Sequence, residues 1–352
     1  EVLKTAVEYG ADAVYIGGEM YGLRAKAKNF SAEDMKKGIA YAHERGKKVY
    51  VTANITAHNR DLEGVRAYFH ELKEIRPDAL IISDPGVFTI AKEVCPEIDI
   101  HISTQSNNVN YMTFRFWKEQ GATRVVTARE LSLEEIGDIR KNIPDDFEIE
   151  TFVHGAMCIS YSGRCLLSSF MAGRDANKGA CTHPCRWKYY IMEEKRPGEF
   201  LPVEENERGT YIFNSKDLCM IEHIPELVNA GIDSFKIEGR MKTALVSRTY
   251  RQAIDDYFED PQKYIDNIPY YKKEIAKCTY RQFTTGFFFG PTTHDSQIYD
   301  NNTYVKGYEY LGTIHESLED GRGVFEQKNK VSVGDHEADR RKYCDKSAFD
   351  AG

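Results

Sequence analysis

Short β-branched runs alternate with helix-like segments along most of the chain, and this alternation constrains the fold more than any other feature. Helix starts between the runs are marked by Ser31 and Ser132, each followed three residues later by an acidic residue. Strands that alternate with helices predict a parallel sheet with helical connections. The runs that we interpret as strands cover residues 13–17, 48–54, 79–83, 98–103, 124–127, 147–153 and 234–237.

The number and spacing of these units favour a barrel of the TIM type. Eight βα units in about 250 residues are typical of that fold. Neither GxGxxG nor GxxxxGK[ST], which are common in doubly wound sheets, occurs in the chain. The sequence opens at Glu1 in what reads as the middle of an amphipathic helix. We therefore expect an α/β chain in which residues 1–260 form a TIM-type (β/α)8 barrel lacking its first strand, with any targeting segment missing from view.

The remaining segments are expected to form smaller units. A cysteine-bearing insertion occupies about residues 155–210, residues 211–213 are a possible short strand, and residues 215–230 read as a helix. Pro261 and Pro269 interrupt the helical pattern, and alternating runs at 283–289, 308–314 and 323–331 predict a partial β-barrel-like domain over residues 275–334. Residues 335–352 show no period and are expected to form an irregular tail.

Composition excludes some classes of protein. No stretch of 18 apolar residues occurs without charge, so we expect no membrane span. The net charge of −8 argues against a basic coat over the whole molecule, but a local basic patch remains possible. Between residues 158 and 188 the cations are opposed only by Asp175, although a solvated loop would show the same pattern. These cations are Arg164, Arg174, Lys178, Arg186 and Lys188.

Four of the eight cysteines, Cys158, Cys165, Cys181 and Cys185, lie close together in the sequence. Thiolates are soft ligands, and four of them suit either tetrahedral zinc or an iron–sulfur cluster. Structural zinc usually takes both ligand pairs from tight knuckles, and only the last two cysteines are tightly spaced, so an iron–sulfur cluster is favoured over zinc. Buried structural thiols and disulfides are the alternatives. Cysteine usage weakly favours a reducing, cytoplasmic compartment.

Polar residues and glycines follow the predicted strands, at the positions that form the active face of a TIM barrel. They suit an anionic small molecule or a phosphate-bearing ligand. Each of them could instead cap a strand end or form a structural ion pair, for example between Arg129 or Glu130 and Glu238 or Arg240. The positions are Gly17, Gly18, Arg24, Asn54, Asp84, Gln105, Asn107, Asn108, Arg129, Glu130, His154, Glu238 and Arg240.

His154 and Cys158 could form a nucleophile and its base. A separation of four residues would bring the imidazole and the thiol together if the segment were helical. Neither GxSxG nor HExxH occurs in the chain. Cys158 is therefore better interpreted as a cluster ligand.

Several stretches resemble the collagenase-like peptidases of family U32, whose mechanism is unassigned. The most characteristic are ETFVHGAMC at residues 150–158 and SGRCLLS at 162–168. Similar stretches extend the resemblance over about residues 1–334. They are AVYIGG at 13–18, AKAKNF at 25–30, STQ at 103–105, FKIEGRMK at 235–242 and TTGFFFG at 284–290.

This resemblance implies two activities. Some members are credited with a peptidase activity that would act on a peptide substrate, without an agreed nucleophile. Other branches resemble RNA hydroxylation proteins, in which an iron–sulfur cluster on four cysteines supports hydroxylation of a base in tRNA, at the wobble uridine with prephenate implicated, or in rRNA. The cysteines carried over by the resemblance are Cys158, Cys165, Cys181 and Cys185.

We favour RNA hydroxylation over proteolysis or a non-catalytic iron–sulfur protein. A carboxylate-bearing cosubstrate such as prephenate would need a cationic clamp, for which arginine is best suited. The expected clamps are Arg129 and Arg240, with Glu130 and Glu238 as orienting partners or proton carriers and His154 as a general acid or base. RNA phosphates would meet Arg164, Arg174, Arg186 and Lys188.

Overall fold

The structure is a computed structural model that describes part of the chain. The described residues are 1–23, 29–158, 160–187, 190–191, 201–202, 215–239, 243–278, 280–292, 296, 312–317 and 323–327. Within them, no helix has the length and apolar character needed to cross a membrane.

Parallel strands form the body of the main sheet, and all seven predicted strands are present. Each pairs with the next along the chain from β1 to β6, and β10 then pairs with β6. Every residue of β3 is buried, as expected of a parallel strand covered on both faces. The strands are β1 (Ala13–Gly17), β2 (Lys48–Ala53), β3 (Ala79–Ile82), β4 (Asp99–Ile102), β5 (Arg124–Val126), β6 (Glu148–Ala156) and β10 (Ser234–Ile237).

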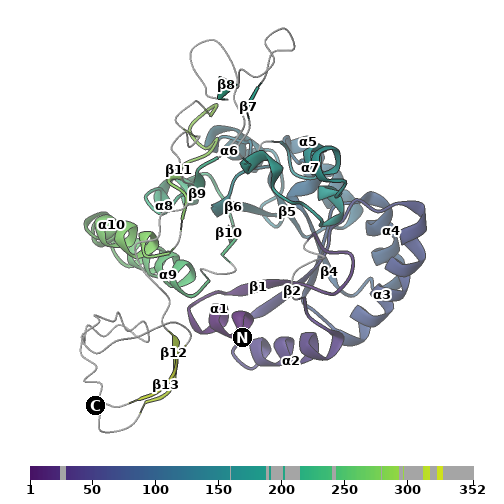
Figure 1. Ribbon diagram of the computed structural model, residues 1–352, viewed down its shortest axis with the longest axis horizontal. Helices are drawn as coiled ribbons and strands as arrows, with labels where there is room; N and C mark the ends of the chain where they lie inside the picture. The colour runs from purple at the N-terminus through teal and green to yellow at the C-terminus, as the bar shows by residue number, and fades with distance from the viewer. Residues whose placement is uncertain are drawn as a thin grey trace.

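Helices surround these strands on the outside, and the strands are arranged about a common interior (Figure 1). Ser31 caps α2, and Ser132 forms a reciprocal capping box with Glu135 at the start of α6, as predicted. The helices on this layer are α1 (Val2–Glu8), α2 (Ala32–His43), α3 (Leu62–Ile75), α4 (Pro85–Val94), α5 (Tyr111–Gln120), α6 (Leu133–Lys141), α8 (Ile224–Asn229) and α9 (Thr243–Glu259).

The ring of strands is not closed by strand pairing in the part of the chain that the structure describes. β1 pairs only with β2 there, and the Tyr15 hydroxyl, which donates a hydrogen bond of 3.4 Å to the Ile237 carbonyl, connects β1 to β10. The parallel α/β architecture is confirmed, and a closed barrel stays a prediction.

Two apolar clusters are separate in this arrangement. The large core contains residues of the strands and of the surrounding helices. The small cluster contains Tyr50, Ala79 and Ile81, with Ala13 packed against it. Tyr50 and Ala79 are register partners on adjacent strands, so they share one face of the sheet. The sheet therefore has a second buried face besides the one that the helices cover.

Two helix predictions were wrong. Residues 215–230 are not one helix: β9 (Asp217–Cys219) comes first, pairs antiparallel with the end of β6, and is followed by the short α8. Asp217 is buried, and its carboxylate accepts a hydrogen bond of 3.1 Å from Arg281 Nε. The helical pattern also continues past Asp260 as α10 (Pro261–Ala276), because Pro261 sits in the first turn, where its missing N–H costs nothing, while Pro269 lies inside the helix.

The strands expected after residue 275 are divided between two sheets. β11 (Phe283–Thr284) pairs in parallel with β9 and so belongs to the main sheet, and the residues after it form a turn around Gly286, whose φ is +58°. β12 (Gly312–Ser317) and β13 (Gly323–Gln327) form an antiparallel pair, in agreement with the strand pattern. Residues 211–213 and 335–352 lie outside the described residues.

Candidate functional site

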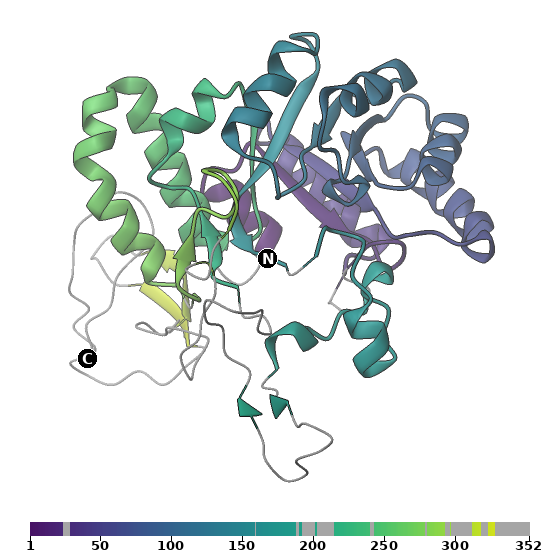
Figure 2. The same cartoon turned by 90° about the horizontal axis from the view of Figure 1, so that it is seen from above.

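A cysteine-bearing segment lies over the carboxyl ends of the strands; we call residues 157–187 the cysteine segment. It contains α7 (Leu167–Ala172), η3 (Ala176–Lys178) and η4 (Pro184–Arg186). Beyond it, β7 (Tyr190–Ile191) and β8 (Leu201–Pro202) form a small antiparallel pair that lies away from the main sheet (Figure 2).

The first half of the cysteine segment is fixed to the turn after β4. Asn107 donates a hydrogen bond to the Ser162 carbonyl at 3.0 Å, and its side-chain oxygen accepts one from Arg164 Nε at 2.7 Å. Gly163, with a φ of +72°, packs against Gln105. Asn107 and Gln105, which the sequence placed at the active face, therefore hold this segment in position.

The second half of the cysteine segment is fixed to the loop after β2. The Thr56 N–H donates to the Asn177 carbonyl at 3.1 Å, and the Lys178 ammonium contacts Asp61 at 2.8 Å. This ion pair lowers the pKa of the Asp61 carboxyl, mainly through its hydrogen bond with Lys178. The segment thus crosses the strand ends from β6 to β2.

The four clustered cysteines differ in their exposure to solvent. Cys158 and Cys181 are exposed, whereas Cys165 and Cys185 are half-buried. The Ser168 hydroxyl lies 3.0 Å from that of Thr182, which links the part of the segment near Cys165 to the part near Cys181. The exposure of two thiols does not fit the alternative of buried structural cysteines, and the structure contains no disulfide among the four.

The donor chemistry of these thiols suits a thiolate-bound cluster or zinc. Among the residues that the structure describes, however, no three His, Cys, Asp or Glu side chains are arranged so that they could hold a metal ion. The four cysteines therefore match such a group in residue type and in their place on one segment, but the structure does not bring three of them together. Their convergence on a single centre stays a prediction.

Arg129 and Glu238 form an ion pair at the strand ends beside this segment. Arg129 follows β5 and Glu238 follows β10, and Nη2 lies 3.0 Å from Oε2. The guanidinium also lies over the Phe152 ring of β6, 4.0 Å from its centroid. Burial opposes the charged form, but the Glu238 carboxylate and then the Cys158 thiol raise the pKa of Arg129. Cys158, the clustered cysteine that directly follows β6, therefore lies within electrostatic range of Arg129, which the sequence predicts as a carboxylate clamp.

Gly155 makes this arrangement possible. Its φ is +135°, and a Cβ built on it would lie 2.7 Å from Glu238 Cβ. Only glycine combines this backbone conformation with so close an approach. The position of Glu238, and through it that of Arg129, depends on the absence of a side chain at residue 155.

A small pocket of about 100 Å³ opens beside Cys158. Its walls come from the end of β6, from the residue before β9 and from the turn after β11. Hydroxyl, thiol and apolar groups all line it, so the pocket can accept a small polar group. The lining residues are Met157, Cys158, Ser215, Thr284, Gly286, Phe287, Thr292 and Ser296.

The helical geometry on which the thiol–imidazole dyad depends is not present. His154 lies in the strand β6, which ends at Ala156, before Cys158. Its ring is buried and packs against Tyr250 of α9 and Phe283 of β11, with centroids at 5.7 and 6.0 Å. His154 is therefore part of the packing between β6 and α9, and a general acid–base role finds no support in its position.

Several other predicted positions have structural roles. Asp84 caps α4 by accepting from the Val87 N–H. Asn108 is buried and accepts a hydrogen bond of 3.0 Å from the Trp117 indole, and Asn54 donates to the Ser103 hydroxyl. These contacts match the alternative reading of strand-end residues as caps and structural partners.

Glu130 follows Arg129 and is half-buried, and burial raises the pKa of its carboxyl. Arg164 and Arg174 lie on the cysteine segment, as does the backbone of Arg186. Arg24, Arg240, Lys188 and the side chain of Arg186 fall outside what the structure describes, so their predicted roles stay predictions.

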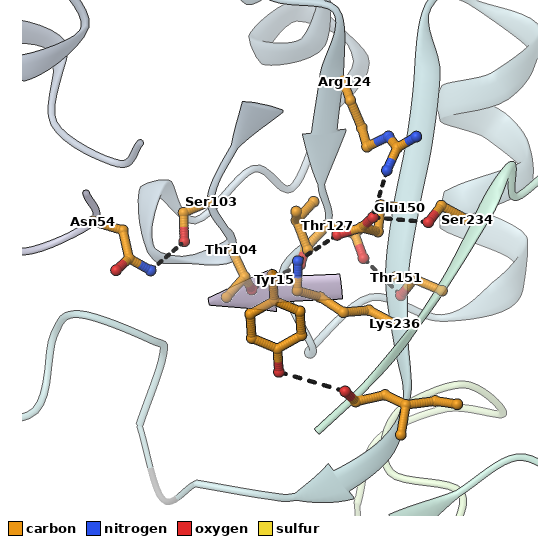
Figure 3. A network of polar contacts seen from close by, with 12 residues as sticks. Tyr15, Asn54, Ser103, Thr104, Arg124, Thr127, Glu150, Thr151, Ser234 and Lys236 are labelled. Atoms are coloured by element: carbon orange, nitrogen blue, oxygen red, sulfur yellow. Dashed lines mark hydrogen bonds and ion pairs between the residues drawn. The ribbon is translucent and has the colours of Figure 1, made fainter. Parts of the chain in front are cut away.

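The sequence reasoning missed a buried charged network on the inner strands. Glu150 of β6 accepts hydrogen bonds from Lys236 of β10 at 2.5 Å, from Arg124 of β5 at 2.9 Å and from Ser234 at 2.8 Å (Figure 3). Burial opposes ionisation, but Lys236 and Arg124 outweigh it and lower the pKa of Glu150 to about 2. The sequence contains a signal for this buried network, because these charged residues occur within otherwise apolar strands.

The geometry can be compared with known proteins. The chain matches the model of the family described as peptidase family U32 over residues 1–298. It belongs to family U32. The U32 resemblance of the sequence motifs is thereby confirmed.

Relatives of this U32 chain carry two kinds of name. The chain is 40% identical to tRNA hydroxylation protein P1 of Bacillus subtilis, covering 95% of this chain and 80% of that protein. It is also 40% identical to tRNA hydroxylation protein P of Escherichia coli, covering 95% and 82%. An uncharacterized protease of Methanocaldococcus jannaschii is 42% identical, covering 95% and 80%.

Proposed function

We propose that the chain hydroxylates a base of tRNA, with the wobble uridine as the target, at the strand ends beneath the cysteine segment. The observation that carries this proposal is the neighbourhood of Cys158 and the Arg129–Glu238 pair. Cys158, a soft sulfur donor, lies within electrostatic reach of Arg129, a cation that can hold a carboxylate. The names of the two bacterial relatives support the substrate class.

The cluster ligands in this proposal are Cys158, Cys165, Cys181 and Cys185, with zinc as the alternative metal. When bound, an iron–sulfur cluster supplies electron transfer. The exposure of Cys158 and Cys181 leaves their sulfurs accessible for ligation. Within the segment, the hydrogen bond between the Ser168 and Thr182 hydroxyls links the stretch that carries Cys165 to the stretch that carries Cys181.

Arg129 would bind a carboxylate-bearing cosubstrate such as prephenate. A guanidinium has five N–H donors, so the single hydrogen bond to Glu238 leaves capacity for a ligand. Glu238 orients the guanidinium, and Phe152 beneath it excludes water from one face. Glu130, whose pKa is raised by burial, is the proposed proton carrier beside Arg129.

A peptidase function has weaker support. One relative is named as a protease, but the His154 ring, the base that the sequence suggested for Cys158, packs against Tyr250 and Phe283. A non-catalytic role for the thiols would not account for Arg129, an arginine near Cys158 that can bind a carboxylate.

The proposal is tested by purifying the chain without oxygen and measuring iron and acid-labile sulfide, then measuring hydroxylated nucleosides in tRNA from cells that lack their own relative. We expect bound iron and sulfide, and restored hydroxylated uridine when the chain is supplied. Unmodified tRNA despite a folded, iron-loaded protein would overturn the proposal. Peptide cleavage with unmodified tRNA would favour the peptidase instead.

A further inference from the structure

Large apolar side chains are exposed on the cysteine segment, and we call them the aromatic patch. Exposed apolar groups that gather on one unit mark interaction sites more often than scattered ones do. Phe170, at 86%, is the most exposed large hydrophobic side chain among the described residues. The patch consists of Tyr161 (47%), Leu166 (70%), Phe170, Met171 (40%) and Trp187 (45%).

The local fold brings these side chains onto one small unit. Leu166 is the N-cap of α7, and Phe170 and Met171 lie within that helix. η4 contacts α7, and Trp187 directly follows η4 as its C-cap. The hydrogen bond of 3.1 Å from the Thr182 N–H to the Ser168 hydroxyl holds the two parts together. Leu166, Phe170, Met171 and Trp187 are therefore carried by two neighbouring elements of one small unit.

The charge around the aromatic patch favours one kind of partner. The chain carries a net charge of −8, yet the segment from Cys158 to Trp187 has four cations and one carboxylate, Asp175. Of these cations, Arg164 is held by Asn107 in the first half of the segment, and Lys178 forms an ion pair with Asp61 in the second half. Aromatic rings interleaved with cations are the composition that proteins use to bind unpaired nucleotides, whose bases stack while their phosphates are neutralised.

The aromatic patch also lies on the segment that covers the candidate site. Ser162 and Arg164, which flank Gly163 near the start of the patch, contact Asn107 at the end of β4. Cys158, three residues before Tyr161, lies in the electrostatic range of Arg129. A nucleotide held by the patch would therefore be close to the strand ends where the base is to be modified.

We infer that the aromatic patch is a stacking platform for unpaired bases of the RNA substrate, with Phe170 and Trp187 as its main contacts. This inference rests on the proposed function and narrows it to RNA that presents single-stranded nucleotides, such as a loop. Duplex RNA cannot use the platform because its bases are already stacked and paired. The platform supplies affinity for bases, and the cations supply affinity for phosphates.

The test measures binding of the full chain to a fluorescein-labelled, uridine-containing single-stranded RNA and to the corresponding perfect duplex. We expect tighter binding of the single strand. Phe170→Ala and Trp187→Ala should each weaken that binding about five- to tenfold, because one stacking contact is lost. Phe170→Trp should retain it. Phe258→Ala is the matched control, since Phe258 is 67% exposed on α9, outside the segment.

Salt dependence separates stacking from charge. Phe170→Ala should leave the slope of log affinity against log salt concentration unchanged. Arg174→Ala should reduce the size of this slope by about one, because one phosphate contact is lost. If Phe170→Ala and Trp187→Ala bind the single strand as well as Phe258→Ala does, the stacking platform is overturned while the proposed function stands.

Two further outcomes also contradict the inference. If the unchanged chain binds neither RNA, the proposed function falls and the stacking platform falls with it. If RNA affinity is unchanged but Phe170→Ala abolishes self-association in sedimentation, the aromatic patch contacts a second copy of the chain and not RNA.

Discussion

Arg129 is the residue on which the proposed chemistry depends most. Its guanidinium bonds to Glu238, stacks over Phe152 and lies near the Cys158 thiol. Lysine would keep the charge but lose the planar group that both stacks and binds a carboxylate through two donors.

We therefore predict that Arg129→Lys lowers the yield of hydroxylated nucleoside about 10- to 100-fold, the range expected when a charged hydrogen bond is lost. The protein should remain folded, because a cation is still available to Glu238. Mass spectrometry of digested tRNA gives the yield, and thermal unfolding checks the fold. Full modification by the lysine variant would remove Arg129 from the site.

A second prediction at this scale concerns Gly155. Gly155→Ala should lower the free energy of unfolding by about 1–3 kcal/mol, because alanine is strained at this φ and its Cβ would collide with Glu238. Gly137→Ala in α6 is the control, since nothing lies within 4 Å of an added Cβ there and a helical alanine should stabilise by about 0.4–1 kcal/mol. Urea unfolding of both variants gives the two values, and equal effects would contradict the role of Gly155.

At the scale of elements, β5, β6 and β10 are joined by the network around Glu150. Arg124, Glu150 and Lys236 are all buried, so each charge depends on the others. Removing one member of such a set leaves its partners unpaired. The strands that carry the candidate site at their carboxyl ends are therefore held in place partly by ion pairing beneath it.

We predict that Glu150→Gln lowers the free energy of unfolding at pH 7 by about 3–5 kcal/mol. The exposed Glu134→Gln on α6 serves as the control and should change it by less than about 0.5 kcal/mol. Denaturant unfolding measures both. A Glu150 variant as stable as the control would show that the network contributes nothing.

The same carboxylate predicts how stability depends on pH. The pKa of Glu150 is about 2 in the folded chain and near the ordinary value of 4.5 when unfolded. The unfolded state therefore binds more protons between these values, so this stabilisation is complete above pH 4.5 and is lost as the pH falls towards 2. Unfolding at pH 7 and pH 3 should show a smaller loss for Glu150→Gln than for the unchanged chain, and equal losses would contradict the assignment.

Elements were predicted from the sequence with uneven success. Regular strands such as β1 and β10 were placed at their observed bounds because β-branched runs between turn residues carry a local signal. The strand β9 was missed because its conformation depends on the ion pair between Asp217 and Arg281, which are distant in sequence. Pro269 was taken as a helix breaker, yet packing of α10 on α9 keeps it helical.

The candidate site was predicted in part from the residues that follow the strands. The sequence indicates Arg129 and Glu238 because the strand ends of a parallel sheet meet at one edge, and an ion pair between them is one of the alternatives that it allows. The role of Gly155 and the pocket beside Cys158 could not be foreseen, since they arise from approaches between β6, β10 and β11 that no local pattern encodes. The spacing of four residues between His154 and Cys158 would bring the two side chains together only in a helix, and His154 lies in the strand β6.

At the scale of the whole molecule, a parallel α/β sheet presents Arg129 and Glu238 at its strand ends, and the cysteine segment, which carries the thiols and the proposed RNA-binding surface, lies over them. The segment is attached in its first half by Asn107 and in its second half by Asp61. Chemistry and RNA recognition would therefore depend on the same short stretch of chain.

The most direct test is the amount of hydroxylated uridine in tRNA from cells whose only copy of this protein is Cys158→Ala. Cys278→Ala is the matched control, because Cys278 is half-buried and lies after α10, outside the cysteine segment. We predict that the modification disappears with Cys158→Ala and persists with Cys278→Ala, at equal protein levels. Undiminished hydroxylated uridine in the Cys158 variant would contradict the thiol-dependent site.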